Sequence, residues 1–166
     1  MKVDIWVVRE SLKYLPGARQ SAMMVMARDR DYPELVESLR GRRVLIWSCT
    51  TCARLCGVTG RDGAEGLASR LRADGIDVVG TASTSAACLM PKVADRMPAD
   101  IGYDTVLALT CGIGASCASK HSRVDIVNPV ETFGYGYMDA SGEPVAMLPE
   151  GDRPLSAISD RSGPFL

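Results

Sequence analysis

The chain has 166 residues, of which 46% are hydrophobic. It contains 19 lysines and arginines and 20 aspartates and glutamates. This length and composition suit one domain with a sizeable apolar core. The balanced charge, without a basic run, gives no electrostatic footprint for nucleic-acid binding. The N-terminus lacks the apolar region of a signal peptide, and no run of about 20 apolar residues would insert into a membrane. We therefore expect a cytoplasmic protein.

The first part of the chain carries weak signals. Residues 1–30 read as an N-terminal extension: residues 3–7 alternate as in a strand, residues 11–15 suit a helical turn, and the apolar residues 22–26 fit a helix or a strand. Asp31 then offers an N-cap, with Pro33 early in the helix that follows.

Helices and strands alternate from this point to residue 130. The strand at residues 43–47 is followed by helix 64–74, strand 76–81, helix 89–97, strand 104–110, helix 116–121 and strand 123–127. Such alternation is typical of an α/β fold, here an open parallel sheet of about four strands with helices on both faces. Residues 31–130 would form this α/β metal-binding domain.

The periodic pattern stops at residue 131. The aromatic, glycine-rich residues 132–138 could pair with residues 145–148 as a hairpin. The rest of segment 131–166 is rich in glycine and proline. We expect a C-terminal hairpin followed by an extended tail, which either lies over a partner or is partly disordered.

The sequence contains six cysteines and one histidine, His121. Disulfides are rare in the reducing cytoplasm, so cysteines there indicate metal binding or thiol redox chemistry. A single histidine cannot build a His-rich zinc site, and at a predicted helix end it caps the helix or faces solvent. The candidate ligands are therefore thiolates.

The cysteines gather at the ends of predicted strands. Cys49, Cys88 and Cys111 each lie at, or shortly after, the C-terminal end of a different strand. Parallel strands bring these ends to one edge of the sheet, where open α/β folds place their ligands. Cys52 and Cys56 follow Cys49 in the spacing C-x2-C-x3-C, which puts all three on one face if the segment after Cys49 is helical.

Three kinds of chemistry fit these thiols. A [4Fe–4S] cluster and a structural zinc ion each take four thiolates. The cluster is favoured because zinc sites usually pair two C-x2-C motifs and this chain has one. The N–H groups of Gly57, Gly112 and Gly114 could approach cluster sulfurs and tune the potential. A thiol–disulfide redox protein would use Cys49 and Cys52 and leave Cys56 without a role.

Cys117 reads as a small buried apolar residue instead of a ligand. The chain shows no Ser-His-Asp or Cys-His arrangement, so we assign no catalytic residue.

Several of these segments resemble a known family over about residues 31–140. Residues 31–41, Arg43 to Cys52, Cys56, Cys88 and the Thr110-Cys-Gly-Ile-Gly114 element are similar to the methylenetetrahydrofolate reductase C-terminal-domain family. The family includes the MetV-type small subunit that accompanies a flavin-containing reductase in bacteria. Two departures are Cys117, where we expect another residue, and Gly57-Val-Thr-Gly60 in place of a Thr-Gly-Gly element.

The resemblance implies iron–sulfur or zinc centres and a role in one-carbon metabolism, in the reduction of methylenetetrahydrofolate. It implies the metal ligands Cys49, Cys52, Cys56, Cys88 and Cys111. We expect an accessory electron-transfer subunit with a [4Fe–4S] cluster, or alternatively zinc, and with FMN or FAD on the flavin-containing partner subunit. The stretch from Phe133 to Tyr137 is a candidate docking surface. The rival interpretations are a zinc-stabilised assembly module and a thiol–disulfide redox protein.

Overall fold

A parallel sheet of four strands organises the first part of the fold. The computed structural model describes residues 24–58, 61–99 and 102–158, except the side chains of residues 61 and 62. The strands are β2 (Arg43–Cys49), β3 (Asp77–Thr84), β4 (Thr105–Leu109) and β5 (Asp125–Val127). They are all parallel, in the order β3-β2-β4-β5. The predicted α/β class and four-stranded parallel sheet are confirmed.

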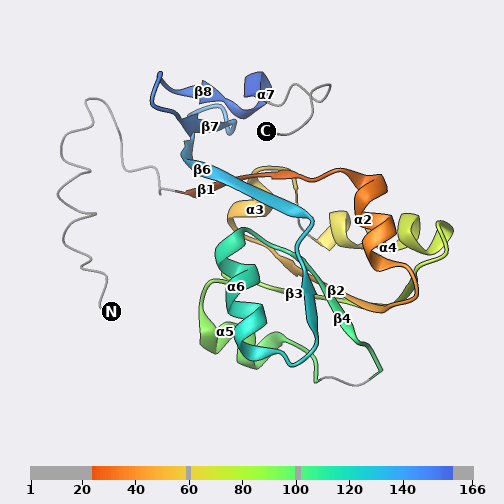
Figure 1. Cartoon of the computed structure of the whole chain (residues 1–166). Helices are drawn as coiled ribbons and strands as arrows, with labels where there is room; N and C mark the ends of the chain where they lie inside the picture. The colour runs from red at the N-terminus through yellow and green to blue at the C-terminus, as the bar shows by residue number, and fades with distance from the viewer. Residues whose placement is uncertain (1–23, 59–60, 100–101, 159–166) are drawn as a thin grey trace.

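Helices cover both faces of this sheet, as Figure 1 shows. They are α2 (Tyr32–Leu39) and α4 (Arg61–Ala73) on one face, and α5 (Met90–Arg96) and α6 (Gly112–His121) on the other. Successive side chains of a strand point to opposite faces. In β2, Ile46 therefore packs with Leu71 of α4, whereas Trp47 packs with Val93 of α5.

A second sheet lies beside the C-terminal edge of the first. It is antiparallel, in the order β1-β6-β7-β8. Its strands are β1 (Met24–Asp29), β6 (Val130–Met138), β7 (Pro144–Met147) and β8 (Arg153–Pro154), with α7 (Leu155–Ile158) after them. The apolar segment that fitted a helix or a strand is thus a strand from Met24 on, and the predicted hairpin is present.

A short helix, α3 (Cys52–Leu55), lies between the two sheets and packs against β1 (Figure 1). The buried Met24 and Met26 of β1 contact the half-buried Cys52 and Cys56. The second sheet therefore covers the edge of the first sheet at which the cysteines gather.

Two local predictions differ from the structure. β2 continues to Cys49 and α3 begins only at Cys52, so the first three cysteines do not share one helix face. The β-branched pair Thr50 and Thr51, which disfavours helix, separates the two elements. α6 begins at Gly112, four residues earlier than predicted, because the side chain of Thr132 accepts the Gly112 N–H at 2.7 Å.

The strand and turn predicted within residues 3–15 lie outside the described residues. Within the described ranges, no helix has the length and apolar character needed to cross a bilayer.

Candidate metal centre

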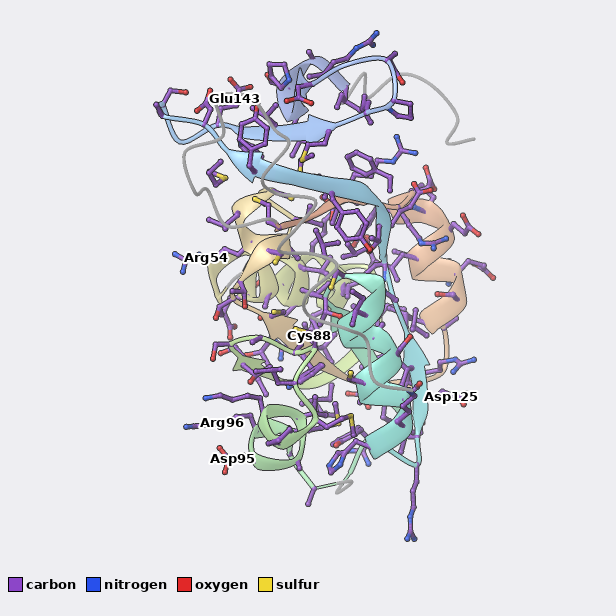
Figure 2. All side chains as sticks on the ribbon, turned by 90° about the vertical axis from the view of Figure 1, so that its left-hand side faces the viewer. Arg54, Cys88, Asp95, Arg96, Asp125 and Glu143 are labelled. Carbon is purple, nitrogen blue, oxygen red and sulfur yellow. The ribbon has the colours of Figure 1, made fainter. Side chains whose placement is uncertain are left out.

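Three cysteines from separate segments lie at the C-terminal edge of the parallel sheet. Cys49 is the last residue of β2 and is buried. Cys111 directly precedes α6 and is also buried, whereas Cys88, in the loop between β3 and α5, is exposed. Figure 2 shows Cys88 in the middle of one side of the molecule, with Arg54 of α3 above it and Arg96 of α5 below.

The two cysteines of α3 lie under the second sheet. Cys52 is the first residue of the helix and Cys56 follows its last residue, and both are half-buried. The Cys56 thiol donates to the carbonyl oxygen of Val25 in β1, with 3.6 Å between sulfur and oxygen. This contact ties α3 to β1.

Burial and the neighbouring thiols shift the pKa values of two of these cysteines. Partial burial raises the pKa of the Cys88 thiol, a backbone hydrogen bond opposes this effect, and negative charge on Cys111, Cys49 and Cys52 adds to it. Burial also raises the pKa of Cys56; a hydrogen bond with the Ala27 backbone opposes this effect, and charges on Cys52 and Cys111 add to it. Burial is the largest cause of both shifts, and the charges of Cys52 and Cys111 add to both.

A hydroxyl group links two of the cysteine segments. Oγ1 of Thr51 lies 3.3 Å from Sγ of Cys49 and accepts the Ala86 N–H at 2.7 Å. The next N–H along the loop, that of Ala87, donates to Sγ of Cys49 at 3.5 Å. These bonds fix the loop that carries Cys88 against the end of β2.

The same loop contains a strained backbone. Ala86 has a φ of 52°, the one positive φ of a non-glycine residue among those described. This conformation costs an alanine about 1–2 kcal/mol and persists only where the surroundings impose it. The hydrogen bond to Thr51 is one such constraint, so the turn before Cys88 is held in place.

The predicted glycines have different roles. The Gly57 N–H donates to the Arg54 carbonyl, and the Gly112 N–H donates to Thr132. Two of the three proposed N–H groups thus already have acceptors within the protein, while Ala87 and Ala27 provide backbone hydrogen bonds to sulfur.

Gly114 allows a close helix approach. A Cβ at this position would lie 2.6 Å from Oγ1 of Thr110 and 3.0 Å from Cβ of Ala87. Only glycine therefore lets α6 sit this close to the end of β4 and to the Cys88 loop.

The remaining cysteine and the histidine lie at the periphery. Cys117 is half-buried in α6 against the Trp47 cluster, and its thiol donates to the Cys88 carbonyl oxygen at 3.5 Å. His121 is the exposed last residue of α6.

The donor set fits a thiolate-bound metal centre. Soft thiolates select zinc or iron–sulfur clusters, and the segments 49–58, 85–89 and 110–117 contain all six cysteines, five of them candidate ligands, and no carboxylate. Within the described ranges, no three His, Cys, Asp or Glu groups already form a group that could hold a metal ion. A bound centre would therefore require these side chains to draw closer together than they stand here.

Sequence reasoning missed three residues of this region: Thr51, Ala86 and Thr132. The hydroxyls between Cys49 and Cys52 are a visible signal, since threonine side chains commonly bond nearby backbone groups. The conformation of Ala86 has no signal in the sequence, and Thr132 comes from the second sheet. Comparison with protein-family models, curated proteins and solved structures gave no match.

Proposed function

We propose that this chain is an accessory electron-transfer subunit that holds one [4Fe–4S] cluster at the C-terminal edge of its parallel sheet. The observation that supports this proposal best is that the loop of Cys88 is bonded to Cys49 through the Ala87 N–H and to Thr51, next to Cys52, through the Ala86 N–H, while Cys111 stands at the same edge of the sheet. These four cysteines are the proposed ligands. Cys56, which bonds the backbone of β1, is the fifth thiol and anchors the second sheet.

The surroundings suit an electron-transfer site. A bound cluster would supply one-electron chemistry, with a potential set by hydrogen bonds to its sulfurs and by solvent exposure. The Ala87 N–H provides one such bond, to Cys49. The burial of Cys49 and Cys111 keeps water from one side, while exposed Cys88 leaves a short path to the surface. In this proposal the second sheet, built from residues 24–29 and 130–154, covers the centre.

We place the subunit beside a flavin-containing reductase, with FMN or FAD, in the cytoplasmic reduction of methylenetetrahydrofolate. This assignment rests on the family resemblance of residues 31–140. The aromatic face of β6 is the proposed docking surface for that reductase. Tyr135 is 57% exposed on this face. Phe133 precedes it and carries the Arg28 guanidinium over its ring, with Cζ 5.4 Å from the ring centroid. Tyr137 follows it and donates a hydrogen bond to the Asp152 carboxylate.

Anaerobic purification tests the proposal. Protein that holds the cluster is brown, absorbs near ~400 nm and contains iron and acid-labile sulfide. Colourless protein with one zinc ion per chain would favour the assembly module instead. Metal-free protein that reduces disulfides would favour the thiol–disulfide redox protein. A flavoprotein that copurifies from the native source would support the proposed partner.

A further inference from the structure

Exposed apolar side chains surround the cysteine segments. Leu55 is 46% exposed, Leu89 52%, Met90 39% and Ile113 47%; we call these four residues the apolar collar. Each stands within three positions of a proposed ligand, Cys52, Cys88 or Cys111. Among the described residues, only Val79 and Tyr135 are other large hydrophobic side chains with comparable exposure.

The collar residues come from segments that meet around Cys88. Thr51, the residue before α3, accepts the Ala86 N–H at 2.7 Å, and Gly114 in the first turn of α6 lies against Ala87, so both helices lie near the Cys88 loop. The thiol of Cys117 joins α6 to the Cys88 carbonyl, and α5 packs beside α6. Cys88 is the exposed member of the proposed ligand set. The collar therefore rims the point at which a cluster would come closest to the surface.

Positive charge accompanies the collar. The segments 50–58, 85–92 and 110–117 contain Arg54 and Lys92, both exposed, and no aspartate or glutamate. The whole chain, by contrast, has a net charge of −1. The ion pairs among the described residues involve neither of these two cations.

We propose that the collar docks a small acidic electron-carrier protein, which exchanges electrons with the cluster through Cys88. An apolar centre with a cationic rim fits a partner whose apolar centre has an acidic rim, because complementary charge steers the encounter. A small patch suits the short-lived complexes of redox proteins, which bury less than about 1,200 Å². The flavoprotein surface on β6 remains free for the other partner.

The step is a simple electron transfer. A bound cluster would accept one electron from the metal centre of the reduced carrier, with no bond made or broken and no proton moved, while the collar of this chain would hold the carrier beside Cys88. This inference rests on the proposed function, since it needs the cluster to be present.

Stopped-flow mixing with a plant-type [2Fe–2S] ferredoxin, an acidic carrier, tests the docking face. The cluster-loaded protein is mixed in both directions, oxidised with reduced ferredoxin and reduced with oxidised ferredoxin, because one direction is downhill in potential. The expected second-order rate constant falls as salt rises. It also falls about tenfold or more in the Arg54→Glu/Lys92→Glu variant and in Leu89→Asp.

Arg40→Glu is the matched control, because Arg40 is an exposed arginine at the end of α2, against the other face of the sheet. It should keep the wild-type rate, and dithionite should reduce the cluster equally in every variant. If the second-order rate constant changed neither with salt nor with the collar substitutions, the proposed docking face would be wrong, while the cluster assignment would stand. Protein without a cluster that dithionite can reduce would overturn both.

Discussion

Replacing Gly114 by alanine tests whether α6 must sit this close to the cysteine edge. The new Cβ would meet Oγ1 and Cβ of Thr110 at 2.6 and 2.9 Å, and Cβ of Ala87 at 3.0 Å. Both neighbours are at most 1% exposed and cannot swing away. Such overpacking costs about 1–3 kcal/mol. Displacing Thr110 also strains its 2.8 Å bond to the Cys111 carbonyl oxygen, worth about 1 kcal/mol.

The helical preference of alanine opposes this cost by at most about 1 kcal/mol. We therefore expect Gly114→Ala to lower the free energy of unfolding by about 1–3 kcal/mol and to reduce cluster loading, because Ala87 precedes Cys88. Urea denaturation of the metal-free protein under reducing conditions measures the first effect, and iron content measures the second.

Gly66→Ala is the matched control. Gly66 lies inside α4, and a Cβ there meets nothing within 4 Å. The same substitution should therefore stabilise the protein by about 0.5–1 kcal/mol without changing the iron content. If Gly114→Ala were as stabilising as Gly66→Ala, the close approach of α6 described here would be wrong.

Three further predictions follow from contacts away from Gly114. Thr51→Val should lower the free energy of unfolding by about 1 kcal/mol and should speed alkylation of the Cys49 thiol, because the Thr51 hydroxyl contacts Cys49 and the Ala86 N–H. Thr51→Ser keeps the hydroxyl and should change neither quantity. Equal alkylation rates in the two variants would show that the Thr51 hydroxyl does not hold this loop. Gly136→Ala should destabilise the second sheet by about 3 kcal/mol in urea melts, because a Cβ there meets the Val145 carbonyl and lies 2.5 Å from Sδ of Met26; unchanged stability would contradict this packing. Hydrogen bonds from the Thr105 hydroxyl and the Arg43 N–H lower the pKa of Asp104. The ionised carboxylate therefore stabilises the folded protein, and this contribution should be lost as the pH falls below about 4. Asp104→Asn should flatten that part of the curve of folding stability against pH.

The parallel sheet could be predicted because its determinants are local. The buried runs Val44 to Trp47 and Val106 to Leu109 alternate with amphipathic helical segments, and this order favours one fold class. The hairpin could also be predicted, because its turn is local: Oδ1 of Asp139 accepts hydrogen bonds from the N–H groups of Ser141 and Glu143.

The second sheet, which covers the edge of the parallel sheet that carries the cysteines, could not be predicted in this way. β1 pairs with β6 across a long stretch of chain, as in the bond from Arg28 to Glu131, 103 positions apart, and no local pattern specifies such a pairing. The start of α6 depends on Thr132 from that sheet, and the strained Ala86 depends on Thr51. The sequence therefore indicated that Cys49, Cys88 and Cys111 stand at or shortly after the ends of three strands, but not which backbone groups would bond them.

The iron and acid-labile sulfide content of anaerobically purified cysteine variants tests the central claim most directly. Wild-type protein and Cys117→Ala should carry about four of each per chain, as a [4Fe–4S] cluster requires. Cys88→Ala and Cys111→Ala, which alter residues from different loops, should each lose most of both. Wild-type protein without iron, or full iron content in both of these variants, would contradict a single cluster held between these loops.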